Sequence, residues 1–73
     1  MSPEKMIHMA NQIARFFESK PHDEGVTGVA DHINAYWEPR MRLQFFALIQ
    51  TNASDFRPLV TEAAPKVRPV QAA

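Results

Sequence analysis

The sequence contains no cysteine and, among its 73 residues, only two glycines, Gly25 and Gly28. Without cysteine the chain can form no disulfide, no zinc site with thiolate ligands and no cysteine-bound iron–sulfur cluster. Two isolated glycines do not make the glycine-rich loop that holds the phosphates of a nucleotide. These absences argue against a disulfide-stabilised fold and against a protein that carries an iron–sulfur cluster or a nucleotide.

No charge of either sign predominates, because eight basic residues balance eight acidic ones. Proteins that bind nucleic acid or an anionic membrane surface usually carry a basic surplus, so we expect neither as the main partner. The longest uninterrupted apolar run, residues 45–49, is far too short to span a bilayer. Residues 1–5 lack the basic and apolar regions of a signal peptide, so we expect a cytoplasmic protein.

The length of the chain limits the stability of its core. A core built from 73 residues contributes only about 3–5 kcal/mol of net stability without a disulfide, a metal or a partner. We expect one helical domain at residues 1–64 and an extended or disordered tail at residues 65–73. Association with a larger partner is the simplest remaining way for such a domain to gain stability.

Apolar residues recur at helical spacing, which predicts an all-α fold. We expect a small bundle of three helices, followed by a short C-terminal helix and an extended tail. Ser2 and Pro3 suit the start of the first helix, and Pro21 should end it. The four helices are expected at about residues 2–20, 22–37, 39–50 and 56–64.

The core faces follow from the same spacing. The first helix should bury Met6, Ala10, Ile13 and Phe17, widened by Met9 and Phe16. The second should bury Val26, Val29, Ala30, Ile33 and Trp37. Gly25, Gly28 and Ala35 form a small-residue stripe on the second helix, which suggests that another backbone comes close there. Alternatively, Gly25 belongs to a loose start of that helix.

The third helix is apolar on two sides. Met41, Phe45, Leu48 and Ile49 form its inner face, whereas Leu43 and Phe46 point elsewhere. A helix that is apolar on two sides is usually buried on both, and this chain has little other material to cover the second side. Leu43 and Phe46 are therefore a candidate partner surface. The alternative is that the fourth helix folds back and covers them.

We find no pattern that predicts catalysis or metal binding. The histidines, His8, His22 and His32, include no pair at the four-residue spacing of a helical metal site. No serine lies in a nucleophile elbow. We therefore expect no catalytic, cofactor-binding or metal-binding residue in this chain, and we interpret His32 as a surface or contact residue. A small metal-binding or catalytic protein that uses these histidines remains the alternative.

The segment at residues 36–42 combines two aromatic side chains with two arginines at the junction of two predicted helices. Tyrosine, tryptophan and arginine are the residue types most enriched at binding hot spots. The fork of an arginine also suits bidentate contact with carboxylates on a partner. The predicted partner interface comprises Tyr36, Trp37, Arg40, Arg42, Leu43, Phe46 and His32.

Three blocks of the sequence carry a family resemblance. Residues 9–17 (MANQIARFF), residues 28–42 (GVADHINAYWEPRMR) and residues 58–64 (PLVTEAA) occur in this order across nearly the whole chain. Together they resemble the delta subunit of NAD-dependent formate dehydrogenases. The middle block is the most specific of the three because it extends over fifteen residues.

The resemblance implies a non-catalytic accessory subunit of a cytoplasmic complex that oxidises formate and reduces NAD. The large alpha subunit of such a complex carries a bis-pterin cofactor with molybdenum or tungsten, together with iron–sulfur clusters. Beta and gamma subunits carry flavin and further clusters. The delta subunit is expected to bind and stabilise the alpha subunit and to support its assembly or cofactor insertion. The alternative is a free-standing helical DNA-binding or regulatory module.

Overall fold

The computed structural model describes residues 1–70, and within them every regular element is helical. Three of the four α-helices have a proline at the first helical position, where the missing N–H costs no hydrogen bond. The Ser2 hydroxyl also accepts a hydrogen bond from the backbone N–H of Lys5 at 3.2 Å and so caps the first helix. The helices are α1 (Pro3–Phe17), α2 (His22–Tyr36), α3 (Pro39–Thr51) and α4 (Pro58–Ala63), with 3₁₀ turns at Ala53–Asp55 and Ala64–Lys66.

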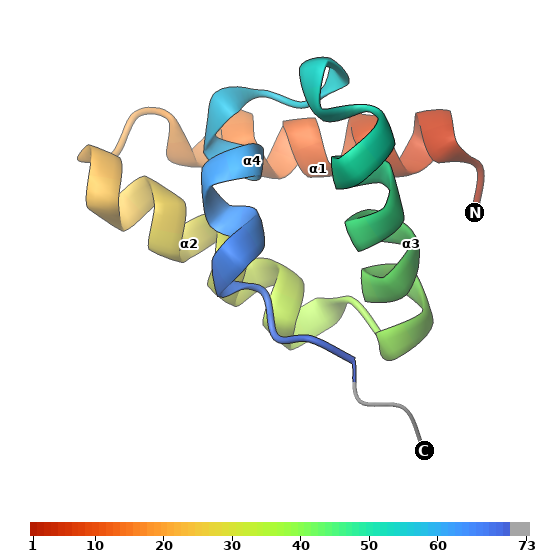
Figure 1. The fold of residues 1–73 in the computed structure, drawn as a ribbon. Coiled ribbons are helices and arrows are strands. Elements are labelled where there is room, and N and C mark those ends of the chain that lie inside the picture. The colour runs from red at the N-terminus through yellow and green to blue at the C-terminus, as the bar shows by residue number, and fades with distance from the viewer. Residues whose placement is uncertain (71–73) are drawn as a thin grey trace.

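The closest helix packing joins α2 to α4 and to α1, while the backbone of α3 lies farther from the other helices (Figure 1). The all-α class is confirmed, but the expected bundle of three helices followed by a short C-terminal helix is not, because α4 packs closely on α2 while the backbone of α3 lies apart. The cause is side-chain size, because helices approach one another closely where small residues meet. Ala10, Ala30 and Ala63 are buried in the contacts of α1, α2 and α4, whereas α3 reaches the core through Phe45.

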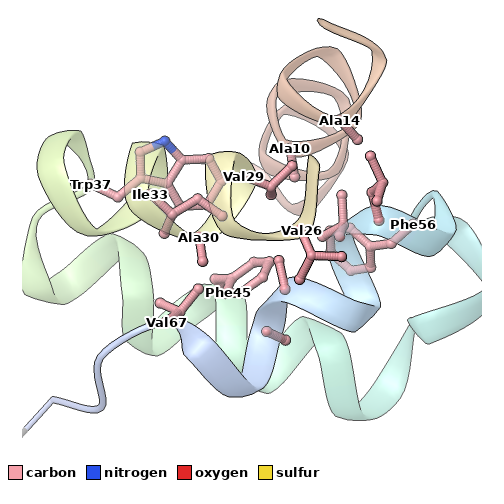
Figure 2. Close-up of a cluster of buried hydrophobic side chains, with 14 of the residues drawn as sticks. Ala10, Ala14, Val26, Val29, Ala30, Ile33, Trp37, Phe45, Phe56 and Val67 are labelled. Carbon is pink, nitrogen blue, oxygen red and sulfur yellow. The ribbon is translucent and has the colours of Figure 1, made fainter. Parts of the chain in front are cut away.

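The core lies among all four helices, and Figure 2 shows Phe45 pointing into it from α3. Phe45 is fully buried and makes edge-to-face contacts with Trp37 at 5.7 Å and Phe56 at 5.8 Å between ring centroids. Such aromatic pairs add stability beyond the burial of their surface. Phe45 therefore links α3 to the end of α2 and to the segment that precedes α4.

On α1 the core face is narrower than the sequence pattern predicted. Met6, Ala10 and Ala14 are fully buried, whereas Met9 is 36% exposed and Phe16 is 68% exposed. Successive helical residues are rotated by about 100°, so Phe16 lies about 200° from Ala14 and points away from the core. The prediction that Met9 and Phe16 widen the core face was wrong, because no other element of residues 1–70 covers that side of α1.

Two asparagines tie distant segments of the chain together. The Asn11 side chain donates to the backbone carbonyl of Asp55 at 3.0 Å and accepts from the backbone N–H of Arg57 at 2.8 Å. Asn34 repeats the arrangement, with the carbonyl of Lys66 at 3.2 Å and the N–H of Arg68 at 2.7 Å. Each side-chain amide thus forms, with a three-residue segment, the two hydrogen bonds that a neighbouring β-strand would form with it.

The middle residue of each of these segments is an apolar anchor. Phe56 lies between the two residues held by Asn11, and Val67 lies between the two held by Asn34; they are 6% and 3% exposed. The asparagines therefore fix the backbone that inserts Phe56 and Val67 into the core. Neither asparagine belongs to the core face that the sequence predicts for its helix.

Replacing Asn34 with alanine should lower the free energy of unfolding by about 1–3 kcal/mol, because both hydrogen bonds from its side chain to the Val67 segment are lost. Urea unfolding followed by circular dichroism measures the change. Gln12→Ala is a suitable control, since within residues 1–70 the Gln12 amide forms a hydrogen bond only with His8 of the same helix. Equal stabilities of the Asn34 and Gln12 variants would show that Asn34 does not hold the segment.

The packed domain continues past the expected boundary at residue 64. Ala64–Lys66 forms a 3₁₀ turn instead of extended chain, and Val67 is buried in the core. The chain becomes extended at Val67, where φ is −76° and ψ is 129°. Residues 71–73 of the predicted tail lie outside the described residues.

Candidate partner interface

Four of the seven predicted interface residues lie on α3, and we call them the α3 surface: Arg40, Arg42, Leu43 and Phe46. Leu43 is 55% exposed and lies three residues before Phe46 on the same helix. Phe46 is half-buried, packs against the core and contacts the Phe45 ring at 5.8 Å between centroids. Phe46 therefore serves the fold as well as the surface, contrary to the prediction that it lies wholly off the core.

A groove runs between α3 and the C-terminal part of the chain. Its lining is largely apolar and comes from both sides: Phe46, Ile49, Gln50, Thr61, Ala64, Pro65, Val67 and Pro69. We call it the α3 groove. The alternative, in which the fourth helix folds back and covers Leu43 and Phe46, is thus met only in part, since Phe46 borders the groove while Leu43 stays exposed.

Two arginines meet beside this groove. Arg42 donates from Nη1 to the backbone carbonyl of Arg68 at 3.0 Å, and Arg68 donates from Nη2 to the carbonyl of Asn34 at 3.2 Å. Arg40 lies two residues before Arg42 on α3, so it points to another side of that helix. We call Arg42 and Arg68 the arginine pair.

The other three predicted interface residues lie elsewhere. Trp37 is 5% exposed and belongs to the core, so the structure removes it from the candidate surface. The large apolar surface of the Trp37 indole is buried against Phe45 and its neighbours, which is more favourable than exposure to solvent. Tyr36 is 74% exposed and lies against His32, with 4.8 Å between the ring centroids.

Tyr36 and His32 belong to a second apolar area, which we call the α1–α2 surface: Met9, Ile13, Phe16, His32 and Tyr36. A hollow lined by Ile13, Phe16, Phe17 and His32 lies between the two helices. Sequence reasoning missed Phe16 as a surface residue. The signal that could have identified it is its rotation of about 200° from Ala14 around the helix axis. The prediction instead followed the apolar character of its side chain.

The glycine stripe is used within the chain. A Cβ on Gly28 would lie 2.4 Å from Cε1 of Phe17, and one on Gly25 would lie 3.0 Å from the Phe17 carbonyl oxygen. Gly25 therefore allows the close backbone approach that the sequence suggested, and Gly28 makes room for the Phe17 ring. Ala35, the third member, remains exposed.

Two polar contacts between side chains link the α1–α2 turn to the region of α4. Arg57 binds Glu18 through both its Nε and its Nη2, the latter at 2.9 Å, and His22 contacts Glu62 at 3.1 Å. Glu18 and His22 flank the turn, whereas Arg57 precedes α4 and Glu62 lies in the last turn of α4. Within residues 1–70 no three His, Asp or Glu side chains converge as they would around a metal ion.

The Glu18–Arg57 pair predicts a pH dependence of stability. The hydrogen bond from Arg57 lowers the pKa of the Glu18 carboxyl from its ordinary value. A carboxyl whose pKa is lower in the folded state stabilises the protein above its unfolded pKa, and this contribution disappears as the pH falls through the folded pKa. The stability difference between the parent and Glu18→Gln should therefore shrink in acid. A difference that stays constant down to pH 2 would contradict the pairing.

No helix within the described part of the chain is long and apolar enough to cross a membrane. No curated protein and no solved structure matches the sequence. The sequence model of the NADH-dependent formate dehydrogenase delta subunit, FdsD, matches residues 5–64, which include every α-helix except the first two residues of α1. This match confirms the resemblance carried by the three sequence blocks: the chain belongs to the family of formate dehydrogenase delta subunits.

Proposed function

We propose that this chain is a non-catalytic accessory subunit that binds the large alpha subunit of a cytoplasmic NAD-dependent formate dehydrogenase. The observation that carries the proposal is the exposed Leu43, which follows Arg42 on α3, on a chain that belongs to the delta-subunit family. Arginine is enriched at binding hot spots, and Leu43 and Phe46 supply apolar surface on the same helix. Arg40, Arg42, Leu43 and Phe46 form the proposed contact with the alpha subunit.

The proposed contribution is to the assembly of the alpha subunit or to the insertion of its bis-pterin cofactor. The chemistry of formate oxidation then belongs to the molybdenum or tungsten centre and the clusters of other subunits, and flavin belongs to the beta or gamma subunit. The delta chain supplies a folded helical surface. Its small core and its exposed apolar side chains are consistent with a subunit that gains stability from its partner.

Deletion of the delta gene tests the proposal in cells that make the complex. We expect the alpha subunit to lose most of its metal, or to become insoluble, because its folding or cofactor loading lacks a partner. Metal analysis of the purified alpha subunit measures the first effect, and its soluble yield measures the second. An alpha subunit with normal yield, metal content and activity in the deletion strain would exclude an assembly role.

A further inference from the structure

Charge is unevenly distributed over this neutral chain. α2 carries the carboxylates of Asp23, Glu24 and Asp31 and contains neither lysine nor arginine. α3 carries Arg40 and Arg42 and contains no acidic residue. The ion pairs within residues 1–70 involve none of these five side chains. A net charge of zero therefore conceals one acidic helix and one basic helix.

The α1–α2 surface offers a place for an apolar side chain. Its hollow, lined by Ile13, Phe16, Phe17 and His32, has a volume of about 310 Å³. A cavity of about 150 Å³ already holds a benzene molecule, so the hollow has room for one aliphatic side chain. The exposed Phe16 ring lies edge-to-face on the Phe17 ring, with 5.0 Å between the centroids, and so forms one wall of the hollow.

Carboxylates border this hollow. Glu24 and Asp31 are exposed and share a shallow depression with Gly28. Gly28 in turn packs against the Phe17 ring, which lines the hollow. Asp31 also precedes His32, another lining residue, in the chain. The surface thus combines an apolar recess with negative charge at its edge, and it suits an apolar side chain that is accompanied by a cation.

The exposed face of α3 has that composition. Leu43 and Arg40 are both exposed and lie three residues apart. This spacing turns the helix by about 300°, so the two side chains point within about 60° of each other from neighbouring turns. Arg42, which belongs to the arginine pair, points to another side. α3 therefore presents an exposed leucine together with one positive charge.

These two surfaces belong to different parts of the molecule. The hollow lies between α1 and α2, whereas α3 lies at the end of the molecule opposite the turn that joins α1 to α2 (Figure 1). A folded chain therefore does not place its own Leu43 in its own hollow. A second copy of the chain has no such restriction.

We infer that a second copy of this chain docks on the α1–α2 surface, with its Leu43 in the hollow and its Arg40 beside Glu24 and Asp31. Because the contact joins two different surfaces, each copy keeps one surface free and association continues head to tail. The contact is small, and interfaces below about 1,200 Å² are typically weak. Leu43 also belongs to the proposed contact with the alpha subunit, so that subunit and the second copy exclude each other.

The test measures the mass of the full chain alone by sedimentation equilibrium, at concentrations from about 10 μM to about 1 mM. Leu43→Asp blocks the α3 side of the contact and leaves the hollow intact, whereas Phe16→Lys removes a wall of the hollow and leaves α3 intact. Ser54→Asp and Ser54→Lys introduce the same charges at an exposed position and serve as matched controls. Circular dichroism checks the folding of each variant. If Phe16→Lys unfolds, Asp31→Lys replaces it, because Asp31 is exposed and unpaired within residues 1–70.

The average mass of the parent and of both Ser54 controls should rise with concentration, and it should rise less at high salt because the charges are screened. Each blocked variant alone should stay a monomer. An equimolar mixture of Leu43→Asp and Phe16→Lys should reach twice the chain mass and grow no further, because it retains a single intact contact.

A parent that is monomeric at about 1 mM overturns the inference. A mixture of the two blocked variants that remains monomeric also overturns it, since any association of the parent then joins like surfaces. The inference goes beyond the proposed function and does not depend on it. Because only the delta chain is measured, either result leaves binding to the alpha subunit to be judged separately.

Discussion

Phe45→Ala should unfold most of the isolated chain at room temperature. Phe45 is fully buried and touches the rings of Trp37 and Phe56, so its removal leaves a large cavity between α3 and the rest of the core. Such truncations cost about 3–5 kcal/mol. That cost is as large as the whole net stability of about 3–5 kcal/mol expected for a domain of this size.

The measurement is far-ultraviolet circular dichroism of the purified variant, followed by urea titration. Leu43→Ala provides the control on the same helix, because Leu43 is 55% exposed and two residues away. It should change the free energy of unfolding by no more than about 0.5 kcal/mol. A Phe45→Ala chain as stable as the Leu43→Ala chain would show that α3 is not held through Phe45.

Leu43→Asp should have the largest effect on binding to the alpha subunit while leaving the fold intact. The substitution places a charge at the most exposed apolar position of the α3 surface. A loss of about 2–4 kcal/mol, equivalent to at least about 30-fold weaker binding, is typical of disruption at an interface centre. Binding is measured by calorimetry or by surface plasmon resonance with immobilised alpha subunit.

Two variants make this result specific. Ser54→Asp adds the same charge to an exposed position of the turn after α3 and should bind like the parent. Phe16→Ala truncates the exposed phenylalanine of the α1–α2 surface, which is the other candidate surface for binding the alpha subunit. If Phe16→Ala weakens binding and Leu43→Asp does not, the alpha subunit binds across α1 and α2 and the α3 surface is not the contact.

Local signals in the sequence were sufficient for the helices. Proline at the first position marks the starts of α1 and α3, and helical spacing identifies the buried residues of α2. These features depend on neighbours within one or two turns, which the sequence displays directly. The all-α class and the approximate lengths of the first three helices follow from them.

The contacts made by Asn11 and Asn34 could not be predicted in this way. Asn11 accepts a hydrogen bond from Arg57, which lies 46 residues later in the chain, and Asn34 accepts one from Arg68, 34 residues later. No local sequence pattern indicates contacts at such separations. The same reason explains why Val67 was assigned to the tail and why α4 was expected at the periphery. Trp37 was ambiguous for a different reason, since the same residue type is favoured both in cores and at interfaces.

Recovery of partners by an affinity-tagged delta chain tests the central claim most directly. The tagged chain is purified from cells that make the formate dehydrogenase, and the bound proteins are identified by mass spectrometry. The account predicts recovery of the alpha subunit in stoichiometric amount with the parent, and its loss with Leu43→Asp. Recovery of the folded chain without the alpha subunit, before or after the cofactor is inserted, would contradict it.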